Sequence, residues 1–388
     1  MTITKNNSLL WIARILVGVL FIFSGLIKLN DPLGFSYKLE EYFEVFHLIF
    51  LNPLAIYFSV FLCALEVIFG VFLLAGIAPK KTLWGLLLLI IFFTFLTFYS
   101  AAFDVVKTCG CFGDAIPLTP WQSFTKDLIL SALIIFLFIN RSHIRAESHQ
   151  RKAKIIVWST VVLTLAFGIY TYTFLPIIDF LPYKTGANIP DAMRVPEGAP
   201  QDEYAITYTL KNKKTGEEKD MTDKEYLETK IYENPDWEFV SSTDPVLVKA
   251  GYQPKIKDFN VFDSQGVNYT KEILDNPYYN LIAVSWKLDG MNEKAMGDIN
   301  ALAINAAENY NIRSILLTSN SAEDADRYSK DLKLLMEIFY ADAVPLKSMV
   351  RSNPGLILMR KGTIIAKWPA AALPSYQDLE EKYFSQQY

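Results

Sequence analysis

Cysteine is scarce in this sequence of 388 residues, which contains three, at Cys63, Cys109 and Cys111. Three cysteines are too few for the disulfide framework of a small secreted protein. Positive charge is not in excess either, since 37 Lys and Arg stand against 41 Asp and Glu. The chain therefore lacks the basic character of a nucleic-acid-binding protein. No small-residue cleavage site follows the apolar run Leu10–Phe23, so we expect that run to be retained as a membrane span.

Apolar residues gather before about residue 180 and most of the charge follows them, which indicates a membrane half and a soluble half. A helix needs roughly 20 apolar residues to cross about 30 Å of hydrocarbon. Five runs come near that length, so the predicted bundle has four helices plus a fifth span: Leu9–Leu29, Leu54–Ile77, Leu83–Phe103, Phe124–Ile139 and Ile155–Leu175. Spans of this kind make the lipid bilayer the first expected partner.

The basic residues of the short loops predict the orientation. Lys80 and Lys81 join the second and third spans, and further basic residues join the fourth and fifth: Arg141, Arg145, Arg151, Lys152 and Lys154. If both loops are cytoplasmic, the N-terminus is cytoplasmic too. The loop Asp31–Asn52, the loop with Cys109, and everything after Leu175 then lie outside. In a bacterium, outside means the periplasm, and helical rather than barrel spans indicate the inner membrane, where we expect this protein.

Cys109 and Cys111 are separated by a single glycine in the loop between the third and fourth spans. Their disulfide would close a very small ring, and strained disulfides are the more oxidising and labile kind. We interpret the pair as catalytic in thiol–disulfide exchange. An inert disulfide that pins the loop is the alternative. A metal site would need further ligands, and His47, Glu44 and Asp114 show no recognisable spacing, so we assign no metal.

Two charged residues lie inside the predicted spans. Glu66 is near the middle of the second span, where a carboxylate is costly and usually faces the bundle interior. Arg14 is about one and a half turns inside the first span, and the two would pair if Arg14 reaches inward. The pair is either structural, with Arg14 otherwise extending to the interface, or a proton or quinone site. We take both as candidate cofactor-binding residues for a quinone.

The soluble half begins with a proline-rich linker, Tyr183–Asp202, for which we expect an extended tether. A strand over Tyr204–Leu210, a second strand and a helix over Thr222–Ile231 form a small insert. From about Lys255 the pattern is α/β in a thioredoxin-like order. The expected elements are Asp258–Phe262, Tyr279–Trp286, Asn292–Tyr310, Ser314–Thr318, Ala322–Leu332, Leu356–Arg360, Thr363–Trp368 and Tyr376–Phe384.

The membrane half resembles the DoxX/MauE group of four-helix membrane proteins over roughly residues 8–143. The stretches that carry the resemblance are Arg14–Gly18, Phe23–Lys28, Asp31–Pro32, Glu66–Gly70 and Cys109–Gly113. The resemblance implies a redox-associated membrane protein. Its MauE branch is linked to disulfide formation in a periplasmic partner, which would be a thiol or disulfide protein here.

The last part, roughly residues 245–388, resembles peroxiredoxins and thiol-reductase domains of the TlpA kind. Phe259–Gly266 is similar to their opening, and Val350–Leu356 to the segment with their cis-proline, which would be Pro354. The family's active cysteines should follow Trp286, but no cysteine occurs after Cys111. This domain therefore cannot exchange thiols itself.

The groove beside Pro354, with Asn353 and Trp286, is then either a binding surface for an extended peptide or part of a degenerate domain kept for packing. The predicted segments are a DoxX/MauE-like domain (1–143), a basic loop with the fifth span (144–182), a linker and α+β insert (183–244) and the thioredoxin-like domain (245–388). Our first hypothesis is an inner-membrane thiol–disulfide protein coupled to a quinone. The alternative is a non-catalytic scaffold whose degenerate domain binds a client.

Overall fold

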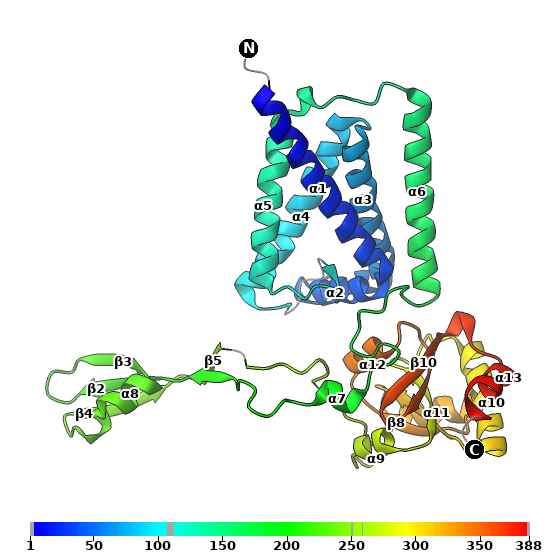
Figure 1. Cartoon of the computed structure of the whole chain (residues 1–388). Helices are drawn as coiled ribbons and strands as arrows, with labels where there is room; N and C mark the ends of the chain where they lie inside the picture. The colour runs from blue at the N-terminus through cyan, green and yellow to red at the C-terminus, as the bar shows by residue number, and fades with distance from the viewer. Residues whose placement is uncertain (1–3, 107–111, 250, 258, 386–388) are drawn as a thin grey trace. The chain divides into compact units, whose positions relative to one another are not determined.

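The computed structural model describes residues 4–106, 112–249, 251–257 and 259–385. They fall into two compact units, Met1–Ala187 with Asn260–Tyr388, and Asn188–Phe259. Among the described residues, the first unit has five helices long and apolar enough to cross a membrane. These are α1 (Thr4–Asn30), α3 (Ala55–Ala75), α4 (Pro79–Phe103), α5 (Pro120–Ile139) and α6 (Gln150–Thr173). Figure 1 shows them side by side as a bundle, so the chain is a multi-pass membrane protein.

All five predicted spans are confirmed as helices, but the first, third, fourth and fifth begin four or five residues earlier than expected. The fourth begins at Pro120 because Thr119 and Gln122 form a capping box, which satisfies the first backbone N–H groups. The fifth begins at Gln150, so the basic residues from Arg151 to Lys154 belong to the first turns of α6 and not to a loop. Both basic segments still lie at the bundle end opposite α2, because successive helices alternate in direction (Figure 1).

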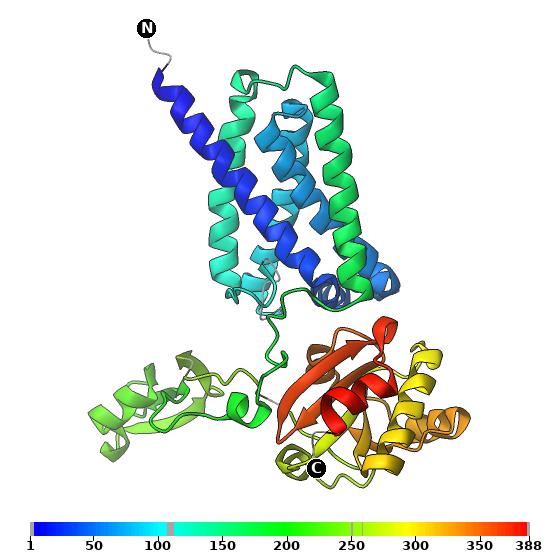
Figure 2. The same ribbon diagram turned by 45° about the vertical axis from the view of Figure 1, so that its right-hand side comes forward.

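The connection Asp31–Asn52 between the first two spans contains a helix that was not predicted, α2 (Pro32–Val45), and the start of a 3-10 helix, Ile49–Leu54. Asp31 starts α2 by accepting a hydrogen bond from the Gly34 N–H at 2.9 Å, and proline is favoured at the first helical position. The buried residues recur at helical spacing: Pro32, Phe35, Ser36, Leu39 and Tyr42. α2 is thus an amphipathic helix at the end of the bundle (Figures 1 and 2).

The contact between α1 and α3 depends on glycines. A Cβ added at Gly25 would lie 2.7 Å from Val67 Cγ2 and 2.8 Å from the Cys63 carbonyl oxygen. A Cβ at Gly70 would lie 2.8 Å from the Gly18 carbonyl oxygen. The two backbones therefore pack at a distance that only glycine allows at these points.

Gly25→Ala is accordingly expected to destabilise the bundle by about 1–3 kcal/mol, the usual effect of overpacking. Unfolding in detergent, followed by circular dichroism, measures it. Gly297→Ala on α10 is the control, because a Cβ there meets nothing within 4 Å. An unchanged midpoint for Gly25→Ala would show that α1 and α3 can separate at little cost.

The first unit also contains a five-stranded sheet in the order β10-β9-β6-β7-β8. β6, β7 and β8 are parallel, and β9 is antiparallel to β6 and β10. The strands are β6 (Tyr279–Ser285), β7 (Arg313–Thr318), β8 (Glu337–Tyr340), β9 (Gly355–Arg360) and β10 (Thr363–Pro369). The helices are α9 (Thr270–Asp275), α10 (Glu293–Tyr310), α11 (Ala322–Leu332), α12 (Ala343–Met349) and α13 (Tyr376–Leu379), with one π turn over Glu380–Phe384.

This sheet confirms the thioredoxin-like order: strand, helix, parallel strand, then a β-hairpin and a closing helix. α10 and α13 contribute residues to one hydrophobic core together with strands of the sheet. β8 and α12 were not predicted. The expected strand Asp258–Phe262 is not formed by its described residues, since Phe262 makes only isolated bridges to Asn268 and Tyr340. The pairing does not continue beyond Phe262, because the next residue, Asp263, enters a tight turn and donates its N–H to the Val267 carbonyl.

The second unit has a three-stranded sheet in the order β3-β2-β4 and a two-stranded sheet, β1-β5. Its elements are α7 (Ile189–Met193), β1 (Glu203–Ala205), β2 (Thr207–Asn212), β3 (Glu218–Thr222), α8 (Asp223–Thr229), β4 (Trp237–Ser242) and β5 (Val246–Lys249). The capping box of Thr222 and Glu225 is confirmed. The predicted tether Tyr183–Asp202 is wrong in part, because it contains α7, capped by Asn188.

Candidate functional site

The predicted catalytic pair, Cys109 and Cys111, lies outside the described residues, so the site is built from its neighbours. Phe112 is buried. Its ring centroid is 5.7 Å from that of Phe23 on α1, and the ammonium of Lys126 on α5 lies 5.4 Å from the same centroid. The chain immediately after the cysteine pair is therefore packed into the bundle between α1 and α5.

The predicted pairing of Glu66 with Arg14 is wrong. Arg14 donates through Nε to the Leu73 carbonyl and through Nη2 to the Leu74 carbonyl, both at 2.7 Å. It thus neutralises the C-terminal end of α3. α1 and α3 are antiparallel, and the eight residues between Glu66 and Leu74 correspond to about 12 Å along the helix. Arg14 therefore lies at the C-terminal end of α3, about 12 Å along that helix from Glu66.

Glu66 pairs with Lys28, and both side chains are 2 % exposed. The Lys28 ammonium also lies over two aromatic rings, 5.0 Å from the centroid of Phe35 and 4.5 Å from that of Phe93, which adds cation–π attraction. Sequence reasoning missed Lys28 because a lysine near the end of a span ordinarily extends to the interface. Nothing in the local sequence indicates that this one turns inward.

A second ion pair lies on α5, where Lys126, 23% exposed, contacts Asp127. Asp127 is 1 % exposed, and its Oδ2 accepts a hydrogen bond from Thr97 Oγ1 at 3.1 Å. These residues were also missed, although a Lys-Asp dipeptide inside a predicted span is a signal, since intramembrane charges usually have a functional or pairing role.

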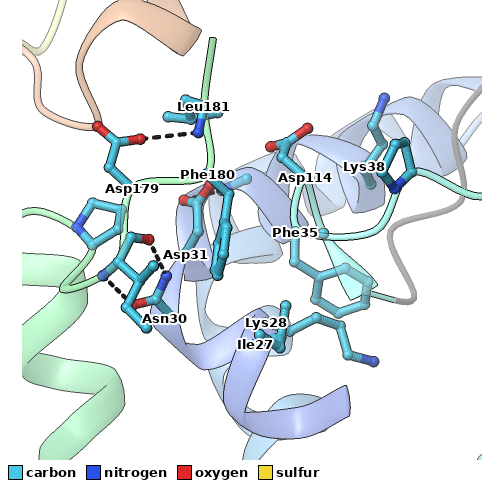
Figure 3. A pocket seen from close by; sticks show the side chains of 15 residues that line it. Ile27, Lys28, Asn30, Asp31, Phe35, Lys38, Asp114, Asp179, Phe180 and Leu181 are labelled. Atoms are coloured by element: carbon cyan, nitrogen blue, oxygen red, sulfur yellow. Dashed lines mark hydrogen bonds between the residues drawn. The ribbon is translucent and has the colours of Figure 1, made fainter. Parts of the chain in front are cut away.

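Both ion pairs line one cavity of about 20 Å³, together with Phe112. A second cavity, of about 70 Å³, shares Lys28 with the first. Figure 3 shows Asp31, Asp114 and Phe180 around the larger one, with Lys28 beside Phe35. Its walls are otherwise largely apolar: Ile27, Phe35, Pro117, Pro176, Ile178 and Leu181.

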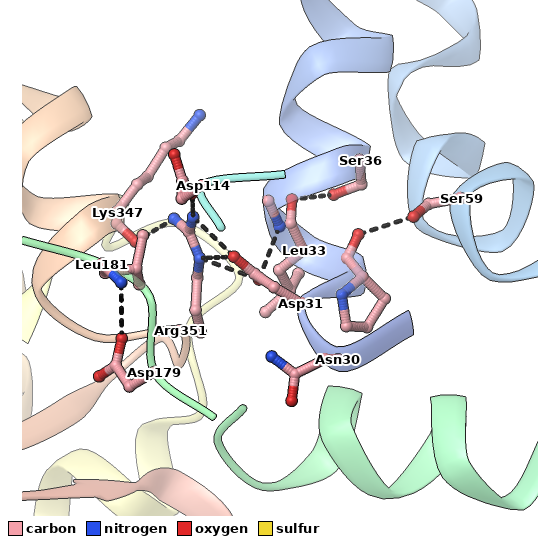
Figure 4. Close-up of polar contacts among 12 residues, drawn as sticks. Asn30, Asp31, Leu33, Ser36, Ser59, Asp114, Asp179, Leu181, Lys347 and Arg351 are labelled. Carbon is pink, nitrogen blue, oxygen red and sulfur yellow. Dashed lines mark hydrogen bonds and ion pairs between the residues drawn. The ribbon is translucent and has the colours of Figure 1, made fainter. Parts of the chain in front are cut away.

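Arg351, which lies between α12 and β9, joins Asp31 and Asp114 (Figure 4). Its Nε is 3.0 and 2.9 Å from the two carboxylate oxygens of Asp31, and its Nη2 is 3.5 Å from Asp114 Oδ2. Burial lowers the Arg351 pKa, but the Asp31 carboxylate outweighs it and the pKa is raised overall. Burial also raises the pKa of Asp114, which Arg351 partly offsets. This cluster therefore ties the segment after the cysteine pair to the thioredoxin-like domain.

The three predicted partner-binding residues lie together where a thioredoxin has its active cysteines. The Asn353–Pro354 peptide bond is cis, which confirms Pro354 as the cis-proline. The Asn353 side chain accepts from Ser285 Oγ at 2.8 Å and donates to the Lys287 carbonyl at 2.6 Å. The ring centroid of Trp286 is 6.2 Å from that of Tyr37 on α2, in edge-on geometry. A peptide bound here would have to displace Tyr37 from Trp286.

Comparisons with known proteins found the following similarities. Residues 6–140 match the family described as methylamine utilisation protein MauE. Protein TlpB of Flavobacterium psychrophilum is 27% identical over 264 residues, which cover 65% of this chain and 66% of the relative. The chain thus spans slightly less than two thirds of that relative. A thiol peroxidase from Chromobacterium violaceum is similar at 13% identity and a TM-score of 0.26, over 34% of this chain and 86% of that one. The chain is a MauE-like membrane domain followed by a thioredoxin-like domain without cysteines.

Proposed function

We propose that Cys109 and Cys111 carry out thiol–disulfide exchange with a thiol protein on the periplasmic side of a bacterial inner membrane. When the pair is oxidised, one S–S bond forms and two S–H bonds break, and two electrons and two protons leave. When the disulfide then oxidises the dithiol of the partner, the pair is reduced again. The reverse direction obeys the same balance. A MauE-like domain with the pair in the loop between two spans supports this function.

The observation that carries the proposal is the position of Phe112. This residue directly follows the cysteine pair, is buried, and lines the cavity with the Lys28–Glu66 and Lys126–Asp127 pairs. Buried charges in a membrane domain are costly and are usually associated with transport or proton transfer. Their presence beside the cysteine loop favours redox chemistry over an inert anchor.

A quinone dissolved in the bilayer would supply the two-electron acceptor. The larger cavity suits such a group, because its apolar walls match a ring and Lys28 is among its lining residues. The Lys28 ammonium has three N–H groups, of which one is given to Glu66, so it can also donate to a carbonyl oxygen. In this proposal Lys28 orients the carrier, and the apolar walls exclude water. Lys28 thereby replaces Arg14 as the cation of the predicted quinone site.

The second candidate function is a scaffold in which the thioredoxin-like domain binds a client. The absence of cysteine after Cys111 favours it. The hydrogen bonds of Asn353 argue against it. The Asn353 side-chain amide already bonds to Ser285 and to the Lys287 carbonyl of its own chain, so it is not turned toward a client. The two functions differ in whether the cysteine pair reacts.

The Cys109→Ser/Cys111→Ser variant is expected to lose all oxidation of the partner, because no other cysteine lies in that loop. In intact cells, alkylation by a membrane-impermeant maleimide before and after a brief dithiothreitol pulse measures the redox state and the accessibility of Cys109 and Cys111. We expect the pair to be labelled after the pulse and quickly reoxidised. Cys63→Ser is the control, since Cys63 is buried inside the bundle. Full partner oxidation by the double variant would favour the scaffold.

A further inference from the structure

We propose that the 20 Å³ cavity beside Phe112 is a proton-transfer site, in which Glu66 and a bound water carry the protons of the thiol reaction. The inference rests on the proposed function, because it assigns the path of the protons that the cysteine pair releases or takes up. The site has three parts in the bundle: the carboxylate of Glu66 on α3, the cation of Lys28 on α1, and the Lys126–Asp127 pair on α5.

The two carboxylate oxygens of Glu66 differ in their hydrogen bonding. Oε1 contacts Lys28, whereas Oε2 is buried and has no hydrogen-bond partner within the described part of the chain. A buried acceptor without a partner costs about 1–3 kcal/mol. The residue is 2 % exposed, so bulk water does not relieve this cost. A donor inside the bundle is therefore needed at Oε2.

A water molecule fits that need. A polar cavity holds one water when it offers roughly 10–15 Å³ and two to four polar partners, and this cavity offers about 20 Å³. Glu66, whose Oε2 has no hydrogen-bond partner among the described residues, lines this cavity together with Lys126 and Asp127, and these residues can supply those partners. The water would join the two ion pairs into one polar path that reaches Phe112.

A path of this kind has a function only if protons must move inside the bundle. Hydrocarbon does not carry protons, and disulfide formation releases two of them while a bilayer carrier takes up two. Glu66, with a carboxylate oxygen open to water, can accept and return a proton in this enclosed space. The titratable groups that face it are those of α1, α3 and α5: Lys28, Cys63, Lys126 and Asp127. α4 contributes Ile90 and Phe93.

The test uses the full chain in lipid nanodiscs. The Glu66→Gln variant removes the proton-carrying group and keeps Lys28, which orients the carrier in the proposed function. The side-chain oxygen of the introduced Gln can still accept a hydrogen bond from the Lys28 ammonium, which supports folding. With a short-chain ubiquinone as oxidant, we expect reoxidation of the reduced pair to slow by about a hundredfold, the scale of general acid–base catalysis. Reoxidation by water-soluble diamide, which acts at the loop, is expected to stay at the wild-type rate.

A second readout needs no carrier. The infrared difference spectrum between the dithiol and disulfide forms is expected to show a carboxyl signal in wild type that Glu66→Gln loses. Thr171→Val, which removes a buried hydroxyl bonded to the Leu29 carbonyl, is the control and should change neither readout. A folded Glu66→Gln variant with wild-type quinone kinetics, or an unchanged carboxyl signal, overturns the proton site while the proposed function stands. If Cys109 and Cys111 of the wild-type protein do not interconvert between dithiol and disulfide, the proposed function itself is wrong.

Discussion

Replacing Lys28 by methionine is expected to destabilise the membrane bundle by about 3–5 kcal/mol, the cost of leaving one member of a buried ion pair without its partner. Glu66 would remain as a carboxylate that is 2 % exposed, with no cation in contact. The cation–π contacts of Lys28 with Phe35 and Phe93 would be lost as well. The effect is large because neither bulk water nor lipid can solvate the remaining charge.

Unfolding in detergent micelles, followed by circular dichroism against temperature or sodium dodecyl sulfate, measures this change. The Lys28→Met/Glu66→Met variant is expected to recover most of the stability, because apolar side chains of similar volume can replace a buried pair. Lys38→Met is the matched control. Its lysine pairs with Glu41 at the surface of α2, with side chains 26% and 43% exposed, and such pairs contribute about 0–1 kcal/mol. Equal effects for Lys28 and Lys38 would contradict the buried pair.

Replacing Arg351 by methionine is expected to weaken the contact between α2 and the thioredoxin-like domain by about 3–5 kcal/mol. Arg351 is 6% exposed and pairs with Asp31, which is 18% exposed, and with Asp114, which is 54% exposed, so most of the effect comes from leaving Asp31 without its cation. Asp31 would keep only its bond to the Gly34 N–H among the contacts named above. Hydrogen–deuterium exchange is expected to become faster in α12 and in Tyr37.

The same variant should make this contact depend on pH. Burial already raises the pKa of Asp114, and Arg351 is the main group that opposes the rise. Without Arg351 the pKa in the closed contact moves further above that of the solvated carboxyl. The closed contact then binds the proton more strongly, so it is favoured at low pH and is lost as the pH rises through the raised pKa.

Arg360→Met is the control for both measurements. Arg360 lies exposed on β9 and donates to the Pro277 carbonyl at 3.0 Å, so exchange in α12 should stay within about 0.5 kcal/mol of wild type. An Arg351→Met variant with unchanged exchange and no pH dependence would show that the remaining contacts hold the domain. The salt bridge of Lys367 with Asp179 is one such contact.

Local patterns in the sequence were sufficient for the five spans and for the thioredoxin-like order. Continuous apolar runs identify membrane helices because the bilayer demands that length, and alternating strand and helix patterns identify the α/β part. Pro354 was predictable as the cis-proline from its short motif. The helix α2 was equally readable, from the cap Asp31 and the apolar stripe that ends at Tyr42, but its short length suggested a loop.

Only the tertiary structure decided which charges meet. Glu66 has a cation on α1 in either case, but the antiparallel packing of α1 on α3 selects Lys28 and sends Arg14 to the end of α3. Arg351 and Asp31 are 320 positions apart in the chain, and no local pattern relates them. Periodicity and composition are properties of neighbours in sequence, whereas an ion pair depends on helix register and domain contact, which arise only when distant segments pack.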